Sequence, residues 1–81
     1  MVKLNPLTSI IINLMKSKFI ITFKVKEYGG DTLFRHTYSF IADIAYKDLN
    51  NDTIRNLCLD FIPKDSENIF FDHIINIKQI V

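Results

Sequence analysis

The sequence contains few of the residues on which covalent or metal-dependent chemistry depends: one cysteine and two histidines among 81 residues. Because Cys58 stands alone, no intramolecular disulfide can form, and nothing in the chain requires an oxidising compartment. His36 and His73 are far apart, and no CxxC or HExxH spacing accompanies them, which argues against a zinc site. We therefore expect neither a metal nor a cofactor.

Long apolar runs and a strong charge of one sign are also absent. The apolar segment 10–12 is far shorter than the roughly 20 residues that cross a membrane, and it lacks the flanking residues of a signal peptide. The net charge of +1 excludes the large basic excess that is typical of nucleic-acid-binding domains, although it is compatible with a local basic patch. We expect a cytoplasmic protein that makes no contact with membranes.

A catalytic constellation is lacking as well. Cys58 lies between Leu57 and Leu59, a pattern that predicts a small buried thiol and not a nucleophile. The carboxylates of Asp43, Asp60 and Asp72 fall on different predicted elements, and no spacing brings any two of them together. We expect that the protein is not an enzyme.

Apolar residues are what the chain has in quantity. The hydrophobic fraction is 48% and the charged fraction 23%, which is the composition of a folded chain and not of a disordered one. Eighty-one residues make one domain, over residues 1–81, with no room for a second core. A core of this size gives modest stability, and association into a homo-oligomer is a common remedy.

An apolar stripe predicts a helix over about residues 6–18, with Pro6 in its first turn. The members of the stripe follow one another at spacings of three and four: Leu7, Ile10, Ile11, Leu14 and Met15. Lys16 and Lys18 would lie in the last turn, where cations suit the helix dipole. We expect this helix to cover one end of a β-sheet.

Alternating apolar residues predict two paired strands. The apolar members of the first strand are Phe19, Ile21, Phe23 and Val25. Gly29 and Gly30 then permit a tight hairpin turn, and the second strand begins near Thr32. Between Ile41 and Asp43 the alternation blurs, which predicts a bulge or a barrel corner.

The rest of the chain predicts further short strands, at 53–62, at 69–71 and from Ile75 onward, with a turn at Asp72 and His73. One helix followed by about five strands predicts a mainly β protein. We expect a small five-stranded barrel of the SH3-like or Sm-like type over about residues 19–81, because closure removes exposed strand edges. In that barrel Asp72 would accept hydrogen bonds from the N–H groups of the turn. The isoleucines expected to return to the core are Ile74, Ile77 and Ile80.

The closing segment, residues 69–74 (Ile-Phe-Phe-Asp-His-Ile), resembles the closing motif of WYL domains, which are small Sm-like barrels with an N-terminal helix. Arg35 resembles the arginine of the family's second strand, and the similarity covers roughly residues 5–81. The resemblance implies the barrel fold. It also implies a role in sensing nucleotide or nucleic-acid ligands, as in bacterial regulators.

The chain departs from the WYL pattern at two of its motifs, and the arginines of one of them are the kind of group that binding such ligands needs. The Trp-Tyr-Leu position reads Arg55-Asn56-Leu57, and Phe70 and His73 replace the two arginines of the closing motif. These departures imply that ligand binding is changed or lost. Residues 71–76 are also similar to a short segment of the RNA chaperone Hfq, another Sm-like barrel. The number of residues between the glycine turn and this segment is, however, too large for Hfq.

Cationic and aromatic side chains supply the candidate binding site. The residues singled out for a ligand or nucleic acid are Lys24, Lys26, Arg35, His36, Arg55 and His73. If the first two strands pair, Lys24 and Lys26 lie near Arg35 on the outward face, and basic groups beside aromatic ones suit phosphate contact and base stacking. An ordinary solvated sheet face is the alternative for these cations.

Two hypotheses for the function stay open. The first is a non-enzymatic regulatory module that binds a nucleotide or a single-stranded nucleic acid. The second is a stand-alone interaction protein, for example one encoded by a phage, that blocks a host defence or regulatory complex in the manner of an anti-CRISPR protein. In the second case Tyr28, Tyr38 and Tyr46 would anchor the host protein.

Overall fold

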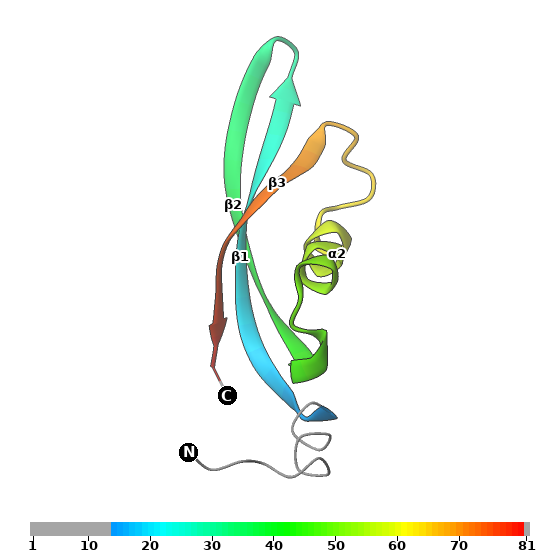
Figure 1. Ribbon diagram of the computed structural model, residues 1–81. Coiled ribbons are helices and arrows are strands. Elements are labelled where there is room, and N and C mark those ends of the chain that lie inside the picture. The colour runs from blue at the N-terminus through cyan, green and yellow to red at the C-terminus, as the bar shows by residue number, and fades with distance from the viewer. Residues whose placement is uncertain (1–13, 81) are drawn as a thin grey trace.

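A computed structural model describes residues 14–80 as a three-stranded antiparallel sheet with one α-helix on one side (Figure 1). The elements follow in the order β1 (Lys16–Gly29), β2 (Thr32–Ala45), the 3-10 turn η1 (Tyr46–Asp48), α2 (Asn51–Phe61) and β3 (Ile69–Gln79). The described part is mainly β, but the predicted five-stranded barrel is wrong. The sheet is open, with β1 in its centre and with β2 and β3 at its edges.

The predicted helix over about residues 6–18 falls mostly outside the described residues. Within them its end is wrong, because β1 already begins at Lys16. Lys16 and Lys18 therefore belong to a strand and not to a last helical turn. The ammonium of Lys18 lies 3.4 Å from Asp43 Oδ1 on β2.

The hairpin of β1 and β2 follows from alternation and from its turn. The pairing runs without a shift from Gly29 and Thr32 down to the other end of both strands. Gly30, the first of the two turn residues, has a φ of 64°, and a type II′ turn places its glycine at this position. The bulge predicted between Ile41 and Asp43 is wrong, since the pairing continues through these residues.

The segment predicted as a strand over residues 53–62 forms α2 instead. Asn50 begins the helix, with its Oδ1 accepting a hydrogen bond of 2.9 Å from the N–H of Thr53. The residues that α2 and its end bury against the sheet recur every fourth position: Ile54, Cys58 and Ile62. Leu57 packs against this core, whereas Leu59 is exposed.

The core lies between α2 and one face of the sheet. Phe23 is its central residue and is fully buried. Its ring contacts those of Tyr38, Phe40, Phe61 and Phe71, with centroids 5.7 to 6.1 Å apart. The tip of the hairpin extends beyond α2, so this end of the sheet has no helical cover (Figure 1).

β3 is one strand where the sequence predicted two. It continues through Asp72 and His73, which were expected to form a turn, and the irregularity appears instead as two register shifts against β1. Ile74 packs against the core, as predicted. Ile77 and Ile80 do not return to it, and each is 39% exposed.

Candidate functional site

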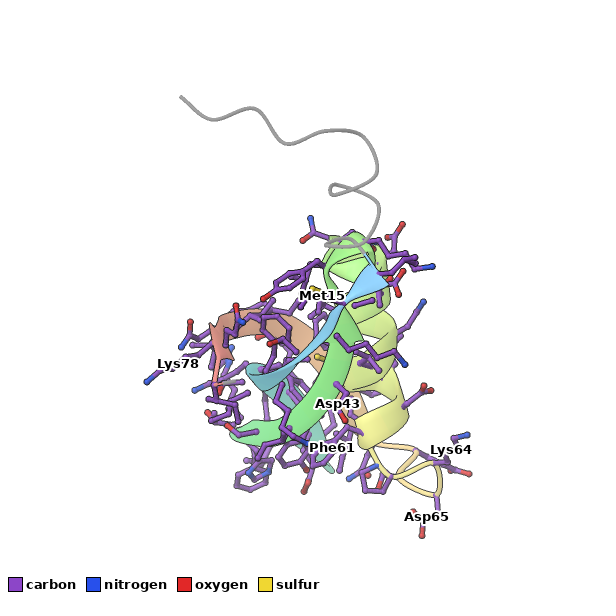
Figure 2. All side chains as sticks on the ribbon, turned by 90° about the horizontal axis from the view of Figure 1, so that it is seen from below. Met15, Asp43, Phe61, Lys64, Asp65 and Lys78 are labelled. Atoms are coloured by element: carbon purple, nitrogen blue, oxygen red, sulfur yellow. The ribbon has the colours of Figure 1, made fainter. Side chains whose placement is uncertain are left out.

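The face of the sheet that points away from α2 is not covered by any element within residues 14–80. Side chains alternate between the two faces of a strand, and the odd-numbered residues of β1 from Phe19 to Val25 fill the core. The even-numbered residues therefore lie on the other side, which we call the open face. Figure 2 shows Lys78, whose register partner on β1 is Ile20, projecting away from α2.

Rows of register partners cross the open face. One row joins Arg35 on β2, Lys26 on β1 and Phe70 on β3. The next row joins Thr37, Lys24 and His73. The predicted neighbourhood of Lys24, Lys26 and Arg35 is confirmed, because the first two strands pair in the required register. What these residues bind stays a prediction.

Two carboxylates partly neutralise the open face. Asp72 Oδ1 lies 3.7 Å from the ammonium of Lys26, and Asp43 pairs with Lys18. Lys24 donates a hydrogen bond of 3.3 Å to Thr37 Oγ1 and has no carboxylate partner in the described part of the chain. Arg35 likewise has no ion-pair partner among residues 14–80. The positive charge of the face is therefore concentrated where the first two rows meet.

His73 lies at the register shift of β3 and not on a turn. Its Nδ1 is 3.3 Å from Asp72 Oδ2, and its side chain is 62% exposed. Asp72 thus lies close to both Lys26 and the imidazole of His73, and it does not cap a turn. His73 stands beside Lys24 on the open face.

An aromatic pair closes one end of the open face. The rings of Tyr28 and Phe70 meet edge to face with centroids 5.9 Å apart, and the two residues are 48% and 52% exposed. From the sequence we expected Tyr28 at a protein interface, and we noted Phe70 only as the residue that replaces an arginine of the WYL closing motif. Residues 69–71 are all apolar, so no alternation in the sequence could have placed Phe70 opposite Lys26.

His36 and Arg55 lie apart from the cations of the open face. His36 pairs in register with the buried Val25, so it points to the side of α2, and its Nε2 lies 3.4 Å from Glu27 Oε2. Arg55 belongs to α2, and its guanidinium lies 5.6 Å from the centroid of the Phe71 ring. The structure therefore does not bring the six predicted binding residues together.

The three predicted tyrosine anchors do not form one surface either. Tyr28 is at the tip of the hairpin, whereas Tyr46 follows the opposite end of β2. Tyr38 packs on Phe23, and Tyr46 packs against the core cluster and accepts a hydrogen bond of 2.7 Å from Gln79. The hypothesis of a host inhibitor stays a prediction, but this set of anchors gives it no common surface.

Cys58 is buried, as predicted, although it lies on a helix and not on a strand. Burial raises the pKa of its thiol from 9.0 to about 11, since the thiolate would lose its hydration. Within residues 14–80 no group of three metal-ligating side chains is present.

The raised pKa of Cys58 predicts a loss of stability at alkaline pH. Because the folded pKa is above the unfolded one, this contribution is complete below pH 9.0 and is lost as the pH rises through about 11. It amounts to about 2 to 3 kcal/mol of the free energy of unfolding. Urea unfolding of the wild type and of Cys58→Ala would measure it, and the variant should show the shallower alkaline decline. Equal declines would contradict the prediction.

Comparison with models of known protein families, with curated proteins and with solved structures finds no match to this chain. The resemblance to WYL domains and to Hfq stays a prediction, and the barrel that it implied is not the fold observed. None of the helices described in residues 14–80 has the length and apolar character needed to span a membrane.

Proposed function

We propose that this protein is a non-enzymatic binding module whose open face holds a single-stranded nucleic acid. The observation that carries the proposal is the row of Arg35, Lys26 and Phe70, with Lys24 and Tyr28 beside it on β1. Cations in this row would contact phosphates, and the exposed rings would stack on bases. This combination is typical of proteins that bind single strands with little sequence preference.

The shape of the site favours an extended ligand over a single nucleotide. Lys24, Lys26 and Tyr28 are successive open-face residues of β1, about 7 Å apart along the strand. A single strand laid along β1 would meet two cations and then the aromatic pair. Arg35 would reach the same strand from β2, and its planar guanidinium can contact a phosphate through two donors.

The test is the binding of a fluorescein-labelled single-stranded oligonucleotide, followed by anisotropy over a series of salt concentrations. Three phosphate contacts predict a slope of about −2 for the logarithm of the association constant against the logarithm of salt. Duplex of the same sequence should bind more weakly, because its bases cannot stack on Tyr28 and Phe70. An absence of binding, or an affinity that does not change with salt, would overturn the proposal.

A further inference from the structure

The outer edge of β2 is a long row of backbone groups without a described partner strand. β2 has 14 residues, its pairing with β1 has no shift, and no other strand within residues 14–80 joins its second edge. A regular edge of this length is a template for another strand, and proteins commonly shorten, bulge or cover such edges. β3, the other edge strand, carries two register shifts, so β2 is the more regular edge.

We propose that two copies of this chain pair through β2, antiparallel about a two-fold axis at Ser39. In this register Arg35 of each copy lies opposite the partner's Asp43. The two three-stranded sheets become one six-stranded sheet, and the helices of both copies lie on the same side of it. The proposal does not depend on nucleic-acid binding.

The direction of the backbone groups limits the choice of register. Across the two-residue turn the N–H of Thr32 donates to the carbonyl of Gly29, and hydrogen-bonded pairs alternate from there. The odd-numbered residues of β2 therefore direct their N–H and C=O groups to the outer edge. A symmetric pair must join odd-numbered residues to odd-numbered residues, and two such registers use nearly the whole strand. One is centred on Tyr38 and the other on Ser39.

Charge decides between these two registers. Arg35 and Asp43 are the charged side chains that β2 contributes to the open face. The register centred on Ser39 places Arg35 of each copy opposite the partner's Asp43, so the ion pair forms twice. Opposite charges that face each other across two strands stabilise the pairing. Centred on Tyr38, it sets Arg35 opposite the partner's Ile41. Lys18 lies 3.4 Å from Oδ1 of Asp43, and the two oxygens of a carboxylate can accept from more than one cation.

Exposed apolar side chains lie along the same edge. Ile41 is 62% exposed, the highest value among the large apolar residues described, and it stands two residues from the proposed axis. On the side of α2, Phe61 is 45% exposed and stacks on Phe40 with centroids 4.9 Å apart. Pairing about Ser39 would set Phe40 opposite the partner's Tyr38, so apolar surface on both faces would be covered.

The experiment is light scattering on a sizing column, over a series of concentrations of the full chain without nucleic acid. We expect twice the chain mass of 9.5 kDa. Arg35→Asp and Asp43→Arg each create two like-charge contacts and should raise the dimer dissociation constant roughly tenfold or more. The double variant R35D/D43R restores opposite charges and should recover the wild-type constant.

Lys64→Asp is the matched control, because it reverses one charge in the connection between α2 and β3. It should leave the dimer unchanged, and circular dichroism would show that every variant keeps the fold. A wild type that stays monomeric at a concentration of about 100 μM would overturn the proposal, since a dimer that dissociates at this concentration is weaker than specific interfaces usually are. Single reversals without effect, or a double variant that does not recover, would overturn it equally.

Discussion

Phe23→Ala should lower the free energy of unfolding by about 3 to 5 kcal/mol, which is a large part of the total for a domain of this size, about 4 to 12 kcal/mol. Phe23 is fully buried, and its ring contacts four other aromatic rings from β2, α2 and β3. Its removal leaves a cavity between β1 and these three elements. The sheet and the helix cannot close this cavity without a shift of the backbone.

Urea unfolding followed by circular dichroism, at one protein concentration for all variants, would measure the loss. Phe70→Ala is the matched control, because it removes the same side chain from an exposed position on the open face. It should cost less than about 1 kcal/mol, whereas Phe23→Leu should fall between the two alanine variants. Equal losses for Phe23→Ala and Phe70→Ala would mean that the core is not where the fold places it.

The hairpin could be predicted from the sequence because its signals are local. Phe19 to Val25 alternate strictly, and Gly30 supplies the positive φ of the turn. These signals hold whatever the rest of the chain does. The closure into a barrel was inferred from the number of strands, and that number was wrong.

The helix α2 was missed because two periodicities overlap in one short segment. Leu57, Leu59 and Phe61 alternate as in a strand, while Ile54 and Cys58 follow the helical spacing. The cap at Asn50 decides in favour of the helix, but in the sequence it stands within a polar run that also fits a turn. Tertiary burial of Cys58 and Ile54 against the sheet then overrides the strand propensity.

The basic part of the candidate site could be predicted, whereas its aromatic part could not. Lys24, Lys26 and Arg35 come together through the hairpin alone. Phe70 joins them only because β3 returns to the far side of β1, and the sequence predicted a different arrangement for this segment. Which face of the sheet stays uncovered depends on where α2 packs, and the sequences of β1 and β2 alone do not determine this.

The double variant Lys24→Gln/Lys26→Gln should reduce the affinity for single-stranded nucleic acid and also change its response to salt. Each lost phosphate contact lowers the slope against salt by about 0.7, so the pair should lower it by about 1.4. At about 0.1 M salt we expect a loss of affinity of roughly tenfold or more. Glutamine keeps much of the side-chain length, so the variant isolates the charge.

Lys47→Gln/Lys64→Gln is the matched control, with the same loss of charge at exposed positions outside the three strands. Equal losses of affinity and of salt slope in both double variants would mean that binding depends on net charge and not on the open face. A response confined to Lys24 and Lys26, with the fold unchanged by circular dichroism, would locate the phosphates on β1. Tyr28→Ala then separates the two parts of the site, because loss of stacking should weaken binding by about 1 to 3 kcal/mol per base while leaving the salt slope unchanged.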